Sequence, residues 1–459
     1  MRIHFIAIGG SAMHNLALTL QKKGHTITGS DDVIYEPSRT RLEQAGLLPA
    51  EQGWFEEKIT AQLDAVILGM HARADNPELL RAQQLGLKIY SYPEFVFHES
   101  QDKRRIVVAG SHGKTTITSM ILHAMQNAGL RTDYLVGASI EGFDRMVELS
   151  DDAPSIVIEG DEYLSSPLDR RSKFLHYRPH VAVLSGIAWD HMNVFTTYDS
   201  YTDCFVRFIR SMEPDSTLIY NSEDPEVVRV VEQAFSISPE LKVNRVPYAT
   251  HPYAIENGRV FLSDGGQQYP VTLFGRHNMS NLSAALLAAE QAGVPKQSFY
   301  RSMADFRGAK NRLERLWDDG RTVVFKDFAH APSKVRATVA AVKELYPDRR
   351  VVAALELHTY SSLNRDFLPQ YRGTMAGADC AFVFYSHHAM QIKRMPELDP
   401  QWVAAQFDHP DLQVCTRIED LRRAVCAVPT DDTVFLLMSS GSWDGTDWLD
   451  SLGLKPGEK

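Results

Sequence analysis

Short apolar runs alternate with stretches of helical periodicity along most of the chain. In the first hundred residues, the runs at 3–8, 26–29, 65–68 and 87–90 predict strands, and residues 12–23 predict a helix with one apolar face. Strands that alternate with helices are typical of a parallel sheet, in which ligands bind beyond the carboxyl ends of the strands. The pattern therefore predicts an α/β unit with a ligand site at one edge of its sheet.

The same alternation occurs twice more after residue 102. It predicts strands at 106–109, 155–158, 180–184, 322–326, 351–355, 380–384, 412–415 and 433–438, and helices at 114–128, 333–345 and 417–427. A chain of 459 residues is long enough for about three domains, and the polar stretch 99–105 is suited to connect two of them. We therefore predict an α/β chain of three domains: a Rossmann-like domain at 1–102, a central P-loop ATPase domain with a mostly parallel sheet at 103–308, and a Rossmann-like domain at 309–459.

Composition narrows the class of protein. The 48 basic and 58 acidic residues give a net charge of −10, which argues against a general nucleic-acid or acidic-membrane binder but allows an anionic small substrate. The four cysteines are scattered without a C-x-x-C pair, which indicates free thiols. We expect no leader, because the N-terminal residues run straight into a predicted strand and glycine turn, and no apolar run reaches the ~18 residues of a membrane span. We expect a cytoplasmic protein whose partners are small molecules.

The stretch 106–116 is the most informative, because an apolar strand passes through a glycine turn into a helix. The N–H groups and the dipole of the helix start favour phosphate, while Lys114 reaches the terminal phosphates and Thr115 binds Mg²⁺. Val108 stands where the general P-loop pattern has glycine, so the loop is the shorter form G-x-x-G-K-T-T. The alternative is a glycine-rich turn that binds no ligand. The predicted ATP cradle consists of Gly110, Ser111, His112, Gly113, Lys114, Thr115 and Thr116.

Acidic residues follow the strand predicted at 155–158. Glu159, Asp161 and Glu162 would lie at the carboxyl end of a parallel strand, where Mg²⁺ ligands belong in a phosphate-binding domain. The pair Asp190-His191 comes after the next strand and can supply a metal contact or orient a phosphate. The alternatives are a charged surface loop for the acids and a structural role for His191.

The first domain has a turn of the nucleotide-binding type after its first strand. Gly9, Gly10 and Ser11 open the first helix, although Ala7 replaces the first glycine of the dinucleotide pattern. The second strand ends at Gly29-Ser30-Asp31, where Asp31 can hold a ribose or, equally, cap a turn.

A later loop of the same domain also follows a strand. His71 and Arg73 can contact a diphosphate there, and the alternative is a solvated loop. In either case Asn76 is expected to cap a helix that has Pro77 at its first position.

The stretch Gly275–Asn278 precedes a strongly periodic helix. Asn278 is suited to cap that helix, and the sharper alternative is that His277 and Asn278 contact adenine. Two further stretches, 326–332 and 438–445, follow predicted strands of the last domain.

Six stretches, taken in order along the chain, resemble the Mur ligase family. They are I-A-I-G-G-S-A-M at the N-terminus, A-G-S-H-G-K-T-T, E-G-D-E-Y, D-H, G-R-H-N and D-F-A-H-A-P. The resemblance covers nearly the whole chain and implies Mg²⁺- and ATP-dependent formation of an amide on UDP-N-acetylmuramate. It also implies that the first domain holds the UDP-sugar, the second ATP and the third the incoming amine.

The resemblance implies a role for each candidate residue. Lys114, Glu159 and His191 would be catalytic, and Thr115, Glu159 and His191 would hold Mg²⁺. Beyond the cradle, the ATP site would include His277, Asn278, Arg312, Asp327 and His330. The UDP-sugar would be bound by Gly9, Gly10, Ser11, Ser30, Asp31, His71 and Arg73.

Two branches of this family compete for the identity of the amine. The segments 171–179 and 438–445 are similar to the branch that attaches the tripeptide L-Ala-γ-D-Glu-meso-diaminopimelate during cell-wall recycling. We favour that branch over the one that adds L-alanine.

Three departures from the expected patterns keep a different class of protein open: Ala7 replaces a glycine, Ala331 replaces a histidine, and Lys326 replaces an acid. In addition, no lysine stands between Asp190 and Leu241, where several relatives carry a carbamylated lysine that the alanine-adding branch also lacks. The different class is a nucleotide-dependent switch without ligation. A dinucleotide oxidoreductase would leave the cradle at Lys114 unexplained.

Overall fold

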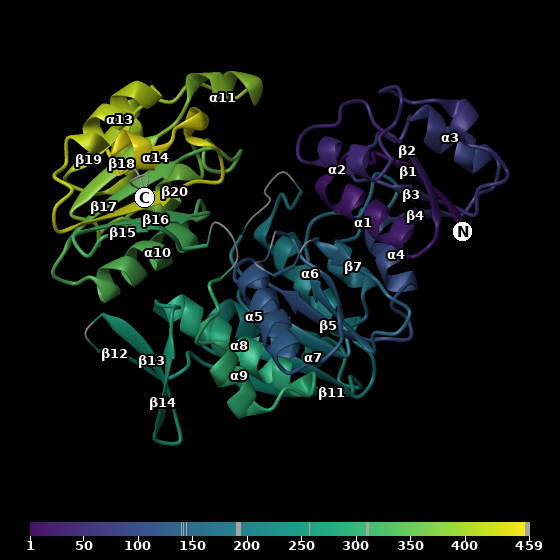
Figure 1. Cartoon of the computed structure of the whole chain (residues 1–459), viewed down its shortest axis with the longest axis horizontal. Coiled ribbons are helices and arrows are strands. Elements are labelled where there is room, and N and C mark those ends of the chain that lie inside the picture. The colour runs from purple at the N-terminus through teal and green to yellow at the C-terminus, as the bar shows by residue number, and fades with distance from the viewer. Residues whose placement is uncertain are drawn as a thin grey trace. The chain divides into compact units, whose positions relative to one another are not determined.

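The computed structural model describes residues 1–138, 140, 142–143, 145–189, 194–256, 258–308 and 312–454. By their internal contacts the residues form two compact units, whose elements are labelled in Figure 1. The first unit comprises residues 1–189, 193–249 and 283–302, and the second comprises 250–282 and 303–459.

The first unit begins with a four-stranded parallel sheet. Its strands, in the order β2-β1-β3-β4, are β1 (Arg2–Ile6), β2 (Thr26–Ser30), β3 (Ala65–Leu68) and β4 (Ile89–Ser91). The helices between them are α1 (Ser11–Lys22), α2 (Ser38–Gln44), α3 (Pro77–Gln84) and α4 (Tyr92–His98), with the short 3-10 helix η1 (Glu56–Lys58). Because the strands are parallel, the residues that follow β1, β2 and β3 meet at one edge of the sheet.

The starts of two helices in this domain are fixed by side-chain caps. The Asn76 side chain accepts a hydrogen bond from the Leu79 N–H at 3.1 Å, and Pro77 is the first residue of α3. Ser91 and Glu94 form a reciprocal capping box at the start of α4. The predicted cap at Asn76 is therefore confirmed.

The centre of the first unit is a seven-stranded sheet in the order β11-β10-β9-β5-β8-β6-β7. All neighbouring strands are parallel except β6 and β7. The strands are β5 (Arg104–Ala109), β6 (Asp133–Leu135), β7 (Val147–Glu148), β8 (Ser155–Glu159), β9 (Val181–Leu184), β10 (Ser216–Asn221) and β11 (Val243–Tyr248). The helices are α5 (Lys114–Asn127), α6 (Tyr198–Arg210), α7 (Pro225–Ile237) and α9 (Lys296–Ser302), with the 3-10 helix η2 (Lys173–His176).

The register of this sheet brings three strand ends together. β5 lies between β8 and β9, so that Val108 pairs with Glu159 and Ala109 pairs with Leu184. From Ile106 to Ala109 the strand has no exposed surface. The apolar run of the sequence is thus a central buried strand, which holds the glycine turn after it in place.

The second unit contains two sheets. β12 (Tyr253–Glu256), β13 (Arg259–Asp264) and β14 (Gln267–Val271) form a small antiparallel sheet. The larger sheet, in the order β15-β16-β20-β17-β18-β19, is parallel except for the edge strand β15. Its strands are β15 (Glu314–Asp318), β16 (Thr322–Asp327), β17 (Arg350–Glu356), β18 (Cys380–Phe384), β19 (Leu412–Cys415) and β20 (Thr433–Met438).

Helices and 3-10 turns connect these strands. α8 (Arg276–Gln291) begins in the second unit and continues into the first. The others are α10 (Pro332–Leu345), α11 (His387–Ile392), α12 (Pro400–Phe407), α13 (Ile418–Cys426) and α14 (Trp448–Ser451), with η3 (Leu368–Tyr371) and η4 (Trp443–Gly445). Val324, Phe435 and Leu437 lie in the buried core of the larger sheet.

The structure confirms the predicted α/β fold with mostly parallel sheets. β3, β18, β19 and β20 have the predicted bounds. The prediction that Asn278 caps the helix after Gly275 is wrong, because α8 already begins at Arg276. The Asn278 amide instead donates to the Phe274 carbonyl oxygen at 3.0 Å and ties the first turn to the preceding chain. Among the described residues, none of the helices has both the length and the apolar character needed to cross a bilayer.

Candidate functional site

The glycines of the predicted cradle occupy positions that a larger residue cannot fill. Gly110 has φ 131°, and a Cβ atom there would lie 2.3 Å from Ser185 Oγ. Gly113 has φ 79° and is the residue from which α5 starts. Such backbone conformations favour glycine. The chain therefore turns tightly from the carboxyl end of β5 into the N-terminus of α5.

Ser111 ties this turn to the loop that follows β9. Its N–H donates to the Gly186 carbonyl oxygen at 2.9 Å, and its Oγ accepts from the Ala188 N–H at 2.8 Å and lies 2.6 Å from the Tyr201 hydroxyl oxygen. His112 packs against the same loop, since a Cβ atom on Gly186 would lie 2.3 Å from His112 Nε2. The side chain of Ser111 is thus engaged within the scaffold of the cradle.

Lys114 is held by a buried carboxylate. Its Nζ donates to the Gly110 carbonyl oxygen at 2.7 Å and to Glu162 Oε2 at 2.5 Å. The Lys114 side chain is 15% exposed and that of Glu162 is 1% exposed. Burial lowers the pKa of Lys114, but Glu162 and Asp161 more than offset this, so the pKa lies above its ordinary value. The ammonium group is therefore charged, and Glu162 is its counterion in this structure.

Glu159 and Thr115 place two oxygen ligands side by side. The Thr115 hydroxyl donates to Glu159 Oε1 at 2.8 Å, and Glu159 Oε2 accepts from the Gly137 N–H at 2.8 Å. A Cβ atom on Gly137 would lie 2.8 Å from Glu159 Oε1, so the carboxylate and the Gly137 backbone approach closely. Hydroxyl and carboxylate oxygens fit the Mg²⁺ that the sequence predicts. His191, which is predicted as a third ligand and as a catalytic residue, lies outside the described residues.

Asp161 has a different cation beside it. Lys173, the first residue of η2, donates from Nζ to Asp161 Oδ2 at 2.6 Å, and the Tyr163 N–H donates to Oδ1 at 3.2 Å. Burial favours the neutral acid, but Lys173 and Lys114 outweigh it and hold the pKa of Asp161 well below its ordinary range. The three acids at the end of β8 thus have different partners: Thr115 for Glu159, Lys173 for Asp161, and Lys114 with the Tyr201 hydroxyl for Glu162.

In the second unit, Asp327 ends β16. Its carboxylate accepts hydrogen bonds from the N–H groups of Leu313 at 2.9 Å and Ala329 at 2.6 Å, and the residue is 7% exposed. Burial raises the pKa of Asp327 to about 6, although Arg312 acts in the opposite direction. The Arg312 guanidinium lies 4.8 Å from the centre of the Phe328 ring. Two of the predicted nucleotide contacts, Arg312 and Asp327, are therefore electrostatically coupled.

The remaining predicted ATP contacts lie in several parts of the chain. His330 Nδ1 lies 2.8 Å from the Phe328 carbonyl oxygen, and the His330 carbonyl oxygen accepts from the Tyr371 hydroxyl. His277 is half-buried in α8, and Thr116 is buried in α5. Their contacts with a nucleotide stay predictions.

Glu356 is a further acid at this strand edge, and the sequence pattern alone does not single it out. It ends β17, is 3% exposed, and accepts hydrogen bonds from the Ser439 hydroxyl and from the Trp443 N–H at 3.0 Å. Ser439 follows β20, which neighbours β17 in the sheet. The available signal was the acid that ends the apolar run 351–355, since parallel strand ends carry functional side chains.

In the first domain, Asp31 supports the glycine turn. The Gly9 N–H donates to Asp31 Oδ2 at 2.7 Å, and the Asp32 N–H donates to Oδ1 at 2.9 Å. Burial raises the pKa of Asp31 to about 6. The structure therefore shows Asp31 in the second of its two expected roles, that of stabilising a turn, and its contact with a ribose stays a prediction.

The other predicted UDP-sugar contacts follow strand ends of the same sheet. Gly10 immediately precedes α1, and Ser11 is its first residue. Ser30 Oγ accepts from Lys58 Nζ at 3.0 Å. His71 and Arg73 are exposed on the loop after β3, where Arg73 pairs with Asp75. Their role in binding a UDP-sugar stays a prediction.

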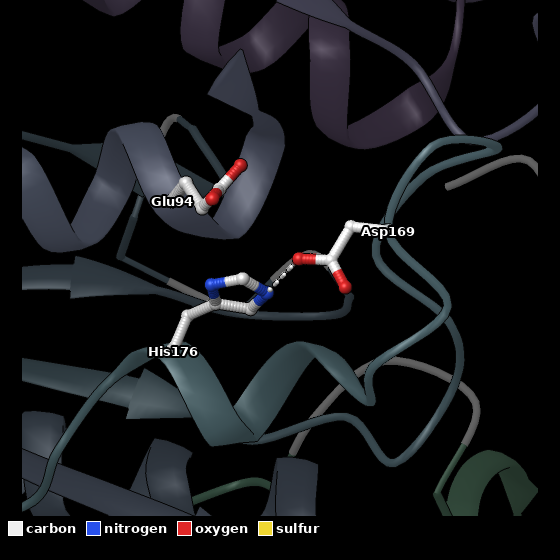
Figure 2. Close-up of side chains that lie close together, drawn as sticks. All are labelled: Glu94, Asp169 and His176. Carbon is white, nitrogen blue, oxygen red and sulfur yellow. Dashed lines mark ion pairs between the residues drawn. The ribbon is translucent and has the colours of Figure 1, made fainter.

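Figure 2 shows another group of side chains of the types that bind metals. The group consists of Glu94 from α4, Asp169 from the loop before η2, and His176 from η2. Their ligand atoms lie within 4.8 Å of one another. His176 Nε2 lies 3.2 Å from Asp169 Oδ2. Arg171 lies 2.6 Å from Asp169 Oδ2 and 3.7 Å from Glu94 Oε1. Because this arginine already compensates both carboxylates, ion pairing accounts for the cluster.

The residues that surround the cradle could not be paired with their partners from the sequence alone. Glu162 belongs to a stretch of acids that the sequence singles out, but it pairs with a lysine 48 positions away. Tyr201 reaches Ser111 across 90 positions. Gly137 belongs to no motif, and Lys173 lies in the segment 171–179, whose resemblance does not indicate which acid it contacts. Only the folded sheet brings these partners together.

Comparison with known proteins gives three family matches in chain order. They are the Mur ligase family catalytic domain at residues 2–104, the Mur ligase middle domain at 108–289 and the Mur ligase glutamate ligase domain at 311–441.

Two curated relatives and one solved structure illustrate the likeness. The chain is 32% identical to a UDP-N-acetylmuramate–L-alanine ligase of Arthrobacter sp., over 83% of this chain and 80% of the relative. It is 28% identical to a UDP-N-acetylmuramate–L-alanyl-γ-D-glutamyl-meso-2,6-diaminoheptandioate ligase of Haemophilus influenzae, over 99% of both chains. Its fold matches a murein peptide ligase of Psychrobacter arcticus with a TM-score of 0.65 and 24% identity over the full length of both chains.

Proposed function

The chain belongs to the Mur ligase family, and we propose that it joins UDP-N-acetylmuramate to the tripeptide L-Ala-γ-D-Glu-meso-diaminopimelate. Members of the family are ATP-dependent ligases that form C–N bonds, so the class of reaction follows from membership. The choice of the amine is the proposal.

The extent of the match carries this choice. The tripeptide ligase of Haemophilus influenzae matches over 99% of both chains, whereas the L-alanine ligase of Arthrobacter sp. matches over 83% and 80%. The segment 171–179, which resembles the tripeptide branch, also reaches the acids at the end of β8 through Lys173. Both observations favour the tripeptide over L-alanine.

The residues of the cradle suit the activation of a carboxylate by ATP. Amide formation from a carboxylate is unfavourable in water, and transfer of a phosphoryl group to the carboxylate gives an acyl phosphate that an amine can attack. Catalysis then rests on positioning and on neutralising charge. When ATP binds, the Lys114 ammonium would turn from Glu162 to the β- and γ-phosphates. Glu162 would remain nearby as a buried negative charge.

Thr115 and Glu159 would hold Mg²⁺, with His191 as a further ligand by family resemblance. The ion supplies positive charge next to the phosphates when it is bound. Glu159 is kept in place by the Gly137 N–H, so its second oxygen remains directed toward Thr115. We assign Arg312, Asp327, His330, His277 and Asn278 to the nucleotide on the same resemblance, with Asp327 directed to the ribose.

We assign the UDP-sugar to the first domain, at Gly9, Gly10, Ser11, Ser30, Asp31, His71 and Arg73. The turn there is rigid, because Asp31 accepts two backbone hydrogen bonds at its base. A rigid turn at the carboxyl edge of a parallel sheet is suited to a diphosphate.

A competition assay tests the proposal. Purified protein receives UDP-N-acetylmuramate, Mg-ATP and equal concentrations of L-alanine and the tripeptide, and the products are separated and weighed by mass spectrometry. We expect the tripeptide adduct together with ADP. Exclusive formation of the L-alanine adduct would instead support the second candidate, an L-alanine ligase, which the 32% identity to the Arthrobacter enzyme favours.

A further inference from the structure

Each acid at the end of β8 has its own partner. Glu159 contacts the Thr115 hydroxyl, Glu162 contacts Lys114, and Asp161 contacts Lys173. The mechanism proposed above uses the first two contacts and leaves Lys173 without a role. Lys173 and Lys114 are the cations that the structure shows bonded to these acids, within the part of the chain that it describes.

Lys173 is fixed in place by its own backbone. Its N–H donates to the Tyr163 carbonyl oxygen at 2.8 Å, and the next residue, Phe174, donates to the Asp161 carbonyl oxygen at 3.1 Å. Phe174 is fully buried and its ring stacks on Phe208 with a centroid distance of 4.6 Å. The start of η2 is therefore clamped to the chain that follows β8. The Lys173 ammonium is delivered to Asp161 by a rigid segment, with 24% of its side chain exposed.

The position of Lys173 has an electrostatic consequence for Lys114. Asp161 also attracts Lys114, so an uncompensated Asp161 would be a second carboxylate that competes with phosphate for the cradle lysine. It would also add negative charge near the site that we assign to the triphosphate, and like charges repel one another. Lys173 offsets both effects by pairing with Asp161.

We propose that Lys173 is a positioning residue for the nucleotide: by neutralising Asp161 it leaves Lys114 free to exchange Glu162 for phosphate. This inference rests on the proposed function only in that ATP is the ligand of the cradle. Lys173 acts through Asp161 and does not itself have to touch the nucleotide. Its importance therefore depends on the charge of Asp161, which makes the proposal testable with a double variant.

The experiment measures the affinity for ATP by calorimetry, with and without Mg²⁺, in Lys173→Met, Lys173→Arg and the double variant Lys173→Met/Asp161→Asn. We expect Lys173→Met to weaken ATP binding by about tenfold or more, which is a modest effect for one uncompensated charge near a triphosphate. Lys173→Arg should bind ATP within about threefold of the unmodified protein, because the cation is kept. The double variant should regain most of the lost affinity, since the charge that Lys173 compensates is gone.

Lys343 provides a matched control. Its Nζ pairs with Asp379 at 3.0 Å, the two side chains are 33% and 46% exposed, and the aspartate also accepts a backbone N–H, from Val351. The Lys173–Asp161 pair is similarly exposed, at 24% and 36%. Lys343→Met should therefore lower thermal stability about as much as Lys173→Met and leave ATP affinity unchanged.

Three results would overturn the inference. A double variant that binds ATP no better than Lys173→Met would mean that Lys173 does not act through Asp161. An unchanged affinity in Lys173→Met, with only a lower melting temperature, would make the pair purely structural. A loss of affinity in Lys343→Met as large as that in Lys173→Met would make the effect unspecific. Failure of the tripeptide assay, together with the expected loss of ATP affinity in Lys173→Met and its recovery in the double variant, would refute the proposed amine and leave the inference intact.

Discussion

Two strand edges of this molecule carry several acids, and the groups that contact these acids differ between the edges. At the end of β8 in the first unit, side-chain cations and a hydroxyl contact Glu162, Asp161 and Glu159. At the ends of β16 and β17 in the second unit, backbone N–H groups and a serine contact Asp327 and Glu356. A lysine side chain such as Lys114 can turn to an incoming anion, whereas backbone N–H groups stay where they are. We therefore expect the first edge to include one contact that exchanges partners, between Lys114 and Glu162, and the second edge to keep its contacts.

The largest effect is expected where a cation has to change partner. Lys114→Ala removes the group that we assign to the phosphates, and we expect UDP-N-acetylmuramate- and amine-dependent release of phosphate to fall by about a thousandfold or more, equivalent to ~4 kcal/mol. The measurement is the rate of ADP formation at saturating substrates. The matched control is Lys343→Met, which removes a lysine from an ion pair outside the cradle. Activity of Lys114→Ala within about tenfold of the unmodified protein would remove the cradle from the mechanism.

The next largest effect is expected at Glu159, the acid of the first edge that accepts a hydrogen bond from the Thr115 hydroxyl. Glu159→Gln keeps the acceptor for the Gly137 N–H but weakens the oxygen pair that we assign to Mg²⁺. We expect a loss of about a hundredfold in kcat/KM for ATP, ~3 kcal/mol, and a higher Mg²⁺ requirement. The measurement is the rate at a series of Mg²⁺ concentrations. If the variant shows the same Mg²⁺ dependence as the unmodified protein, Glu159 is not a Mg²⁺ ligand. The first edge would then differ less from the second edge than we propose.

The difference between the two edges also shows which features a sequence reveals. The strands β18 and β20 were predictable because each is a mostly apolar, buried run in a parallel sheet. The small sheet β12–β14 was not, because its strands are mostly half-exposed or exposed, with polar residues such as Gln267 and Gln268 among them. Local patterns predict a buried strand well and a solvated one poorly.

The same limit applies to the candidate site. The G-x-x-G-K-T-T turn and the acids after β8 were predictable, because a motif and the rule for parallel strand ends locate them within the sequence. Which cation contacts which acid was not predictable, because Lys114 and Glu162 lie 48 positions apart. Asn278 was misassigned because its helix begins two residues earlier, at Arg276. A capping preference describes a residue type, and the surrounding packing decides where the helix starts.

A pH series tests the second edge. Burial raises the pKa of Asp327 to about 6, above the ordinary value near 3.8. As pH rises from about 4 to about 6, the unfolded chain loses this proton while the folded chain keeps it, so the free energy of unfolding falls by at most ~3 kcal/mol. Below this window the contribution is fully present, and above it the contribution is lost.

The measurement is urea unfolding of the unmodified protein and of Asp327→Asn at several pH values. Hydrogen exchange of the β16 amides at the same pH values is the second, local measurement. Because the asparagine does not titrate, the stability of the variant relative to the unmodified protein should increase with pH across this window. Parallel stability curves for the two proteins would show that burial does not raise the pKa of Asp327 in the folded chain. At the first edge no such dependence is expected from Asp161, whose pKa lies well below its ordinary range.

The smallest effect is expected at Ser439, whose hydroxyl donates a hydrogen bond to Glu356. Ser439 is 5% exposed, its hydroxyl donates to Glu356 Oε2, and its Oγ accepts from the Gly441 N–H at 2.7 Å. Ser439→Ala removes one hydrogen bond to a charged group but leaves the Trp443 N–H in place, so we expect the free energy of unfolding to fall by about 1.5–2 kcal/mol. Ser451→Ala is the control in the same unit, because the Ser451 hydroxyl donates only to the Asp447 carbonyl oxygen near the surface. ATP affinity should not change in either variant, because we expect the Ser439 hydroxyl to hold Glu356 in place and to keep this partner when ATP binds. A weaker affinity for ATP in Ser439→Ala, with unchanged stability, would mean that this edge exchanges partners as the first one does.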